Sequence, residues 1–232
     1  MRDTQAEKRQ AGVAAADEVH DGMALGLGSG STVFFFLEEL GRRVREGLRV
    51  QGVPTSISTA RLAGQFGIPL TTFDEQHELD LDVDGADEVD PQLNLIKGHG
   101  GALLREKIIA LAARRRLIIV DETKISPRLG NAVLPVEVVP FARGLAERGL
   151  HQLGGQPRLR QGDGGQPFVT DNANWILDCR FGAIDNPAGL EAAINRVPGV
   201  MDNGLFVGLA DEIVVARATG LERLVRSVQT HA

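Results

Sequence analysis

The chain has 232 residues, a formal net charge of −6 at pH 7, 43% hydrophobic residues and 24% charged residues. This composition is ordinary for a globular protein, and the negative charge argues against nucleic acid as a partner. With only 4% aromatic residues and no tyrosine, a stacking surface for single-stranded nucleic acid is disfavoured as well. No stretch approaches the ~20 apolar residues of a membrane helix, and the N-terminus lacks an apolar signal core. We therefore expect a cytoplasmic protein that contacts neither nucleic acid nor a membrane.

Helices and strands alternate along the first half of the chain. The pattern predicts helices at 4–20, 33–45, 59–66 and 102–115, and strands at 23–27, 49–53, 70–73, 79–84 and 117–120. The last of these strands, Leu117-Ile118-Ile119-Val120, is continuously apolar, as in a parallel strand covered on both faces. Repeated β–α alternation predicts a parallel sheet with helices on both faces, a Rossmann-like α/β domain.

The pattern changes near Pro127. Strands are predicted at 134–139 and 174–179, a helix around Leu145 and Leu150, a glycine-rich hairpin at 154–167 and a helix at 187–195. Two βαβ-like halves suggest a small α+β domain of ferredoxin-like type. Segments 204–208 and 212–215, with a terminal helix at 221–228, are expected to return to the first sheet. The small domain, residues 131–205, would then be an insertion into a main domain of residues 1–130 and 206–232.

The first candidate site is the glycine-rich turn Gly28-Ser29-Gly30-Ser31-Thr32, which follows a predicted strand and opens a helix. That order places backbone N–H groups at a helix start, facing an anion, and the three hydroxyls would add donors. The G-x-G-x-G spacing lacks both the dinucleotide G-x-G-x-x-G and the G-K-[ST] ending of nucleoside-triphosphate loops. A single phosphate monoester is therefore favoured over NAD or ATP. A tight turn capped by serine is an equally good interpretation of this motif alone.

The second candidate site begins with six carboxylates within residues 80–90. In segment 79–84, apolar and acidic residues alternate with the period of two that is typical of a strand. The strand breaks at Asp84-Gly85, a dipeptide favoured in turns. Acidic side chains thus gather where a strand ends, which is where open α/β sheets bind ligands. The alternative is a solvated acidic edge strand.

A lysine in a glycine-rich loop follows, in Lys97-Gly98-His99-Gly100-Gly101, and Glu106 lies in the helix that this loop opens. A carboxylate near a helix N-terminus, beside a lysine, suits proton transfer on a carbon next to a carbonyl. The ammonium or the loop N–H groups would stabilise the enediolate oxygen. A solvated helix face at Arg105-Glu106-Lys107 is the alternative. The carboxylate spacing fits no standard Mg²⁺ or Ca²⁺ loop, and Lys97 would compete with a metal, so we expect none.

Five motifs occur in a fixed order along the chain. They are Gly26-Leu27-Gly28-Ser29-Gly30-Ser31-Thr32, Asp84-Gly85-Ala86-Asp87-Glu88, Lys97-Gly98-His99-Gly100-Gly101-Ala102-Leu103, Arg105-Glu106-Lys107 and Asp121-Glu122-Thr123-Lys124. With Asp202–Phe206 they span almost the whole chain, and they closely resemble ribose-5-phosphate isomerases of the A type. The resemblance implies an enzyme that interconverts D-ribose 5-phosphate and D-ribulose 5-phosphate in the non-oxidative branch of the pentose phosphate pathway. It implies no metal or organic cofactor, and a homodimer or tetramer.

The resemblance also implies roles for individual residues. Glu106 would be the base that moves a proton between C1 and C2, while Asp84, Asp87 and Lys97 would assist ring opening and hold the enediolate. The other matching positions would bind substrate: Ser29, Gly30, Ser31, Thr32, Gly85, Ala86, Gly98, His99, Gly100 and Lys124. Among these, Ser29–Thr32 and Lys124 would hold the phosphate, with Lys8 a weaker candidate. His99 and Asn203 depart from the family pattern, which has Gly or Arg at the first position and His at the second.

Three other functions stay open at this point. The chain could isomerise another phosphosugar with the same phosphate site and a different pocket. It could be a non-catalytic sugar-phosphate sensor, against which the presence of Glu106 and the lack of a helix-turn-helix segment argue. It could be a coenzyme A transferase with a nucleophilic glutamate, which the short chain disfavours. The single cysteine, Cys179, excludes an internal disulfide and is interpreted as a buried structural thiol in a strand.

Overall fold

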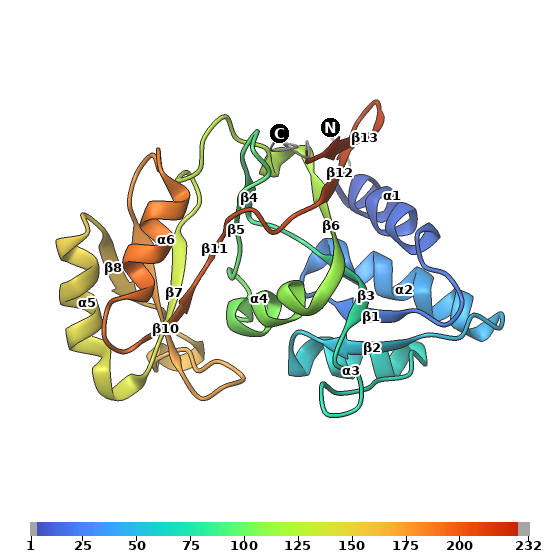
Figure 1. The fold of residues 1–232 in the computed structure, drawn as a ribbon, viewed down its shortest axis with the longest axis horizontal. Helices are drawn as coiled ribbons and strands as arrows, with labels where there is room; N and C mark the ends of the chain where they lie inside the picture. The colour runs from blue at the N-terminus through green and yellow to red at the C-terminus, as the bar shows by residue number, and fades with distance from the viewer. Residues whose placement is uncertain (1–3, 227–232) are drawn as a thin grey trace, which may run out of the picture. The chain divides into compact units, whose positions relative to one another are not determined.

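The computed structural model describes residues 4–226, which form two compact units (Figure 1). Unit 1 contains residues 4–85, 109–124 and 208–226, and unit 2 contains Ala86–Ile108 and Ile125–Val207. Each unit has its own sheet and its own apolar core, and each is described separately.

Unit 1 is built on a six-stranded sheet with the order β13-β12-β6-β3-β1-β2. Its strands are β1 (Ala24–Leu27), β2 (Gln51–Pro54), β3 (Leu79–Asp84), β6 (Ala113–Asp121), β12 (Glu212–Arg217) and β13 (Gly220–Val225). Five of the six run parallel, and β13 pairs antiparallel with β12. The helices are α1 (Thr4–Asp17), α2 (Ser31–Arg45) and α3 (Ile57–Phe66), with the last residues of α4 (Leu103–Ala112). The predicted Rossmann-like parallel sheet is confirmed.

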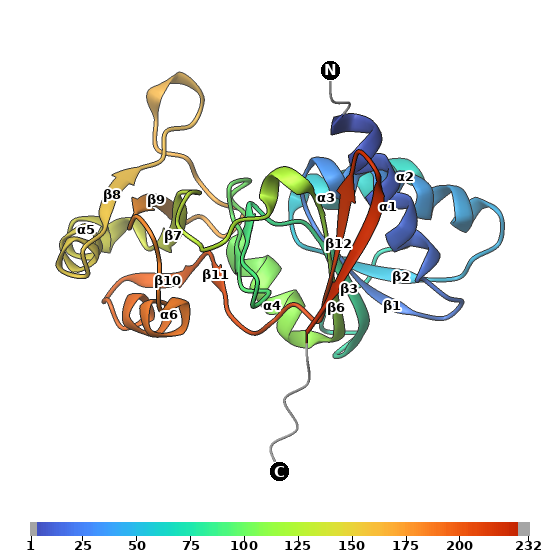
Figure 2. The same cartoon turned by 90° about the horizontal axis from the view of Figure 1, so that it is seen from above.

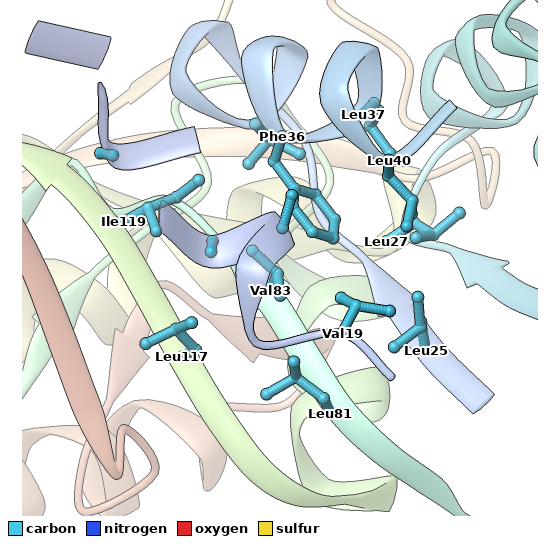
Figure 3. Packing of buried hydrophobic residues seen from close by; sticks show 14 of the residues in the cluster. Val19, Leu25, Leu27, Phe36, Leu37, Leu40, Leu81, Val83, Leu117 and Ile119 are labelled. Carbon is cyan, nitrogen blue, oxygen red and sulfur yellow. The ribbon is translucent and has the colours of Figure 1, made fainter. Parts of the chain in front are cut away.

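Alternate residues of the central strands of unit 1 point into one apolar core. Figure 3 shows Leu25, Leu81, Val83 and Leu117 on the sheet and Phe36 of α2 above them, all with at most 1% of their surface exposed. Apolar residues that alternate along a strand share one face of the sheet, and helices α1 and α2 cover this face. The position of β3 between β1 and β6 overturns the alternative of a solvated acidic edge strand.

Unit 2 carries a four-stranded antiparallel sheet with the order β10-β7-β9-β8. Its elements are β7 (Leu134–Val138), α5 (Arg143–Gln152), β8 (Gln156–Leu159), β9 (Trp175–Arg180), α6 (Pro187–Asn195) and β10 (Val200–Asn203). Figure 2 shows α5 and α6 beside these strands. Both helices pack on the same face of the sheet, since Leu150 and Ile194 share one apolar cluster with Val136 and Leu177. The β-α-β-β-α-β order confirms the predicted ferredoxin-like α+β arrangement.

Unit 2 also contains a small three-stranded sheet with the order β11-β5-β4. Its strands are β4 (Glu88–Val89), β5 (Leu95–Ile96) and β11 (Leu205–Phe206), and both pairings are antiparallel. Short 3₁₀ helices complete the chain: η1 (Glu122–Lys124) in unit 1, and η2 (Pro140–Ala142) and η3 (Asp163–Gly165) in unit 2. The prediction that 204–208 returns to the first sheet is wrong, because β11 pairs with β5.

Three further predictions of secondary structure are wrong. The described part of the predicted helix 221–228 is strand β13, which forms a hairpin with β12; residues 227 and 228 lie outside the described part. The helix predicted to reach Arg115 ends at Ala112, because residues from Ala113 onward pair with β3. The strand predicted at 70–73 is reduced to a single bridge between Leu70 and Gly52. In the first two cases pairing with a neighbouring strand overrides local propensity.

The two units do not follow the predicted domain boundaries after residues 130 and 205. Segment 86–108 lies in unit 2, where β4 and β5 join β11. There the Glu88 carboxylate accepts hydrogen bonds from the N–H groups of Gly130 at 2.9 Å and Ala132 at 3.0 Å. The division into a main domain and an inserted domain stays a prediction. Among residues 4–226, no helix has the length and apolar character needed to cross a membrane.

Four charged side chains fasten the β12–β13 hairpin to β6 and to the end of α1. Arg115 and Arg223 each bind both Glu18 and Glu212, at distances between 2.5 and 3.1 Å. Burial alone would raise the pKa of both carboxyls, but hydrogen bonds from the two arginines outweigh it and lower the pKa of Glu18 and Glu212. The cluster therefore favours the ionised carboxylates in the folded state.

The first prediction concerns this ion cluster. Because the two carboxyls have a lower pKa folded than unfolded, their stabilisation is present above the ordinary glutamate pKa of about 4.3. It is lost as the pH falls through the folded pKa. We expect Glu212→Gln to make the free energy of unfolding less dependent on pH in this acidic range, as measured by urea denaturation. Glu38→Gln, at a more exposed pair with Arg9, is the control and should leave the pH dependence unchanged.

The second prediction concerns the core of unit 1. Phe36 is fully buried, so Phe36→Ala should lower the free energy of unfolding by about 3–5 kcal/mol, the range for truncating a buried phenylalanine. Phe34 lies on the same helix with 38% of its surface exposed and meets the rings of Phe35 and Phe66 edge-on. Phe34→Ala should cost about 1–2 kcal/mol. Equal losses in the two variants would contradict the packing described for α2.

Candidate active site

The glycine-rich turn of unit 1 lies where β1 ends and α2 begins. Helix α2 starts at Ser31, and its N-cap Gly30, at φ 113°, supplies no side chain to cap the first turn. The first N–H groups of a helix have no partners within the helix, and together they favour an anion. Gly30 and Ser31 are exposed, while Thr32 is buried. The turn therefore presents backbone donors and one hydroxyl to the surface.

Asp84 lies at the end of β3, next to this turn. Its side chain is buried, and Oδ1 accepts hydrogen bonds from the N–H groups of Ser29 at 3.1 Å and Gly85 at 2.7 Å. A β-carbon at residue 28 would overlap the Asp84 carboxylate, so the glycine is required for this close approach. The structure thus brings together three residues that the sequence analysis selected separately: Ser29, Asp84 and Gly85.

A cluster of hydroxyl groups behind the turn was missed by the sequence analysis. Ser29 Oγ lies 2.7 Å from Thr55 Oγ1, 3.0 Å from Ser56 Oγ and 2.9 Å from Thr59 Oγ1. Thr59 also donates to the carbonyl of Gly28 at 2.9 Å. The Ser29 hydroxyl is therefore turned into the protein. Residues Ser56-Ile57-Ser58-Thr59 at the start of α3 repeat the Ser-x-Ser-Thr spacing of Ser29–Thr32. This repeat was the signal available in the sequence.

Two lysines were candidates for the phosphate. Lys8 of α1 donates to the exposed Ser31 hydroxyl at 2.9 Å. Lys124 ends the 3₁₀ helix η1 and is half-buried. Within residues 4–226, no hydrogen bond joins Lys124 to the turn at 28–32. The structure thus places Lys8, the weaker candidate, directly at the turn.

In unit 2, the Lys97 ammonium and the Glu106 carboxylate form a buried ion pair. Lys97 Nζ lies 3.4 Å from Glu106 Oε2, and the two side chains are 4% and 6% exposed. Glu106 sits in the first turn of α4, where the helix dipole favours a negative charge. Lys97 follows β5, and its N–H donates to the carbonyl of Gly204 at 2.9 Å. This burial overturns the alternative of a solvated helix face at Glu106.

Asp87 and the glycine-rich loop lie in the same unit. The Asp87 N–H donates to the carbonyl of Ile96 at 2.8 Å, and Asp87 Oδ2 accepts from the N–H of His99 at 2.9 Å. The N–H of Gly101 closes the loop onto the carbonyl of Gly98 at 2.9 Å. His99 contributes this backbone contact, while the residue itself is exposed. Unit 2 thus gathers two carboxylates, an ammonium group and a glycine-rich loop.

The family model for ribose 5-phosphate isomerase A (phosphoriboisomerase A) matches residues 51–220. The chain belongs to the ribose 5-phosphate isomerase A family. It is an isomerase, and the resemblance noted from the motifs is confirmed.

Individual relatives cover nearly the whole chain. Ribose-5-phosphate isomerase A of Bradyrhizobium diazoefficiens is 50% identical over 229 residues, which cover 94% of this chain and 95% of that protein. The solved ribose 5-phosphate isomerase A of Methanocaldococcus jannaschii is 41% identical with a TM-score of 0.92, covering 96% of this chain and 100% of that one. A D-ribose-5-phosphate isomerase in complex with phospho-erythronic acid is 38% identical with a TM-score of 0.94, covering 97% and 100%.

Lys107, next to the Glu106 of this isomerase, is a second buried lysine that the sequence analysis did not select. Its ammonium binds Asp202 at 2.7 Å, Glu191 at 3.0 Å and the carbonyl of Asn203 at 2.9 Å. These contacts hold α4 to α6, which carries Glu191, and to β10, which carries Asp202 and Asn203. Such a buried cation needs several partners to offset the loss of hydration.

Asn203 is fully buried. Its amide donates to Asn195 Oδ1 at 2.8 Å and its side-chain oxygen accepts from the N–H of Leu205 at 3.0 Å. Cys179 is also fully buried, and burial raises the pKa of its thiol to about 12, so it is a structural thiol. Across residues 4–226, no group of three His, Cys, Asp or Glu side chains is arranged to hold a metal ion.

The third prediction concerns the glycine-rich loop of the isomerase. Gly101 has φ 83°, and a β-carbon there would lie 2.5 Å from ring carbons of Phe168. Gly100 has open space around the corresponding position. We expect Gly101→Ala to lower the free energy of unfolding by about 1–3 kcal/mol through overpacking and backbone strain. Gly100→Ala should stay within about 0.5 kcal/mol of the wild type. Urea denaturation of both variants measures the difference, and equal stability would contradict the loop conformation.

Proposed function

We propose that this isomerase interconverts D-ribose 5-phosphate and D-ribulose 5-phosphate through an enediolate, with Glu106 as the general base. The observation that carries this proposal is the buried pair of Glu106 with Lys97, at 3.4 Å, in the first turn of α4. A water-excluded carboxylate is a suitable base for a carbon acid next to a carbonyl group. The phospho-erythronic acid complex of a relative is consistent with a site that accepts a phosphorylated sugar acid.

In the proposed reaction, the Glu106 carboxylate takes the proton from C2 of the open-chain aldose. The electron pair of the broken C–H bond forms the C1–C2 double bond, and the carbonyl oxygen at C1 becomes negative. Glu106 then returns the proton to C1, the hydroxyl oxygen at C2 loses its proton to become the ketone, and the oxygen at C1 gains one. Reactant and product have the same composition, so no oxidant or reductant is required.

The other predicted residues support this reaction in the proposal. Lys97 and the N–H groups of Gly98–Gly100 stabilise the developing negative oxygen, because charge-assisted donors are strongest where water is excluded. Asp84 and Asp87 assist ring opening and hold the substrate hydroxyls, with Gly85 and Ala86 beside them. Gly30, Ser31, Thr32 and Lys124 bind the phosphate, Lys8 joins them through Ser31, and Ser29 holds the turn in place through Asp84 and Thr55.

Assembly and location stay predictions. We propose a homodimer or tetramer and a cytoplasmic location, as inferred from the family resemblance and the composition. No metal or organic cofactor takes part in the proposed reaction.

The fourth prediction tests the base. Glu106→Gln keeps the size of the side chain but cannot accept the proton, so kcat should fall about 10²- to 10⁴-fold, the contribution of general acid–base catalysis. Binding of the phosphosugar should persist, because the phosphate contacts remain. Proton NMR of EDTA-treated protein with ribose 5-phosphate in D₂O measures conversion and deuterium entry at C1 of the ketose or C2 of the aldose. Glu147→Gln, at a surface pair with Arg143, is the control.

Two results would contradict this proposal. Retained turnover in Glu106→Gln would remove Glu106 from the mechanism while leaving the activity in place. A wild-type protein that broadens the ribose 5-phosphate signals without converting the sugar would favour the sensor function instead.

A further inference from the structure

Arg160 lies in the segment that follows β8, and its side chain is only 12% exposed. Its Nε and Nη2 groups donate to the two carboxylate oxygens of Asp178 on β9, at 2.9 and 2.5 Å. This bidentate pair fixes the plane of the guanidinium. The remaining nitrogen, Nη1, donates to the carbonyl of Gly98 at 3.1 Å and to the carbonyl of His99 at 2.9 Å. One side chain therefore joins the four-stranded sheet to the glycine-rich loop.

The backbone around Arg160 is also fixed. Its N–H donates to the carbonyl of Ile176, and its carbonyl accepts from the N–H of Phe168, both at 2.9 Å. The Phe168 ring centroid lies 5.7 Å from Arg160 Cζ, and the same ring lies against Gly101. The guanidinium is thus held by a carboxylate, an aromatic ring and its own backbone before it meets the loop.

Two consecutive carbonyls of the loop point at one nitrogen. A trans peptide holds its C=O and its N–H on opposite sides, so the N–H groups of His99 and Gly100 point away from Arg160. The His99 N–H does so, since it donates to Asp87 Oδ2 at 2.9 Å. Within residues 4–226, no hydrogen bond is found from the Gly100 N–H. Arg160 therefore orients a pair of donors toward the side of the loop on which Asp87 lies.

The guanidinium also makes the N–H groups of His99 and Gly100 stronger hydrogen-bond donors. A cation at a carbonyl oxygen polarises the peptide, and hydrogen bonds in a chain strengthen one another where the local dielectric is low. Adjacent N–H groups aimed in one direction form a concave site for a negative oxygen. If Arg160 only filled space, it would need neither the bidentate pair with Asp178 nor the contacts with two loop carbonyls.

We propose that Arg160, oriented by Asp178, is a positioning residue for the isomerisation: it sets the Gly98–His99 and His99–Gly100 peptides so that the His99 N–H binds Asp87 and the Gly100 N–H stabilises the negative oxygen of the enediolate. This inference rests on the proposed function. Arg160 touches no reacting atom, and it acts through the loop. The oxygen becomes negative only as the proton is transferred. Removing the Arg160 side chain should therefore lower kcat more than it changes KM.

The fifth prediction tests Arg160 with ribose 5-phosphate as substrate. Arg160→Met keeps a long apolar side chain but removes every donor, and we expect kcat to fall about 10- to 100-fold, somewhat less than for removal of an oxyanion donor itself. KM should change about threefold or less, because the phosphate contacts are untouched. Arg160→Lys should recover part of kcat, since an ammonium can reach a carbonyl but cannot make the bidentate pair with Asp178. The control is Arg158→Met, an exposed arginine of β8 that bonds neither carbonyl, and its kcat should equal that of the wild type.

A second readout does not depend on turnover. Amide hydrogen exchange at His99, whose N–H is bonded to Asp87, should become faster in Arg160→Met and stay unchanged in Arg158→Met when followed by NMR. If Arg160→Met fails to fold, Asp178→Asn is judged by the same kcat and exchange criteria, because it removes the charge that orients the guanidinium.

The outcomes separate this inference from the proposed function. A wild type that does not isomerise ribose 5-phosphate overturns both. An active wild type with kcat and loop exchange unchanged in Arg160→Met overturns the role of Arg160 alone. A rise in KM with unchanged kcat would also overturn it, because it would assign Arg160 to ground-state binding. A loss of kcat that Arg160→Lys partly restores supports it.

Discussion

The buried ion pair of Lys97 and Glu106 is the constraint on which the structure of unit 2 depends. Two charges with side chains only 4% and 6% exposed lose most of their hydration, and their attraction offsets this loss only in a well-defined geometry. The surrounding elements supply that geometry. Strand pairing of β5 with β11 holds the backbone at Lys97, and the first turn of α4 holds Glu106 where the helix dipole favours its charge. Lys107, bound to three acceptors around β10, fastens the next residue of the same helix.

Unit 1 presents backbone N–H donors where β1 ends and α2 begins, at one end of its parallel strands. Gly28 lets the Asp84 carboxylate approach the chain closely, and that carboxylate fixes the N–H of Ser29. The hydroxyls of Thr55 and Thr59 then fix the Ser29 side chain from behind. The uncapped start of α2 follows directly. Rigid polar support of this kind allows a loop to bind an anion without reorganising, which is the general requirement for a preorganised site.

Much of this arrangement could be predicted from the sequence. The alternation of apolar and acidic residues placed β3 with its observed bounds, and the continuous apolar run placed the centre of β6, because burial of one or both faces imposes these periods. The candidate residues came from motifs in which neighbours along the chain act together. Arg160 and Lys107 were not selected, since each acts on residues 61 to 96 positions away and no local pattern carries that information. The hairpin of β13 was missed for a different reason: the pattern of residues 220–225 alone does not show their pairing with β12 or the contact of Arg223 with Glu212.

The sequence by itself determined the class of fold, the order of the motifs and the family to which the chain belongs, because these depend on periodicity and on residues close together in the chain. Only the tertiary structure decided which charges are buried, which groups contact the glycine-rich loop and which hydrogen bonds Asn203 and His99 make. Burial and hydrogen bonding are properties of three-dimensional neighbours. The carbonyls of Gly98 and His99 meet Arg160 because strands β8 and β9 pair, and that pairing is stabilised by the core of the whole unit.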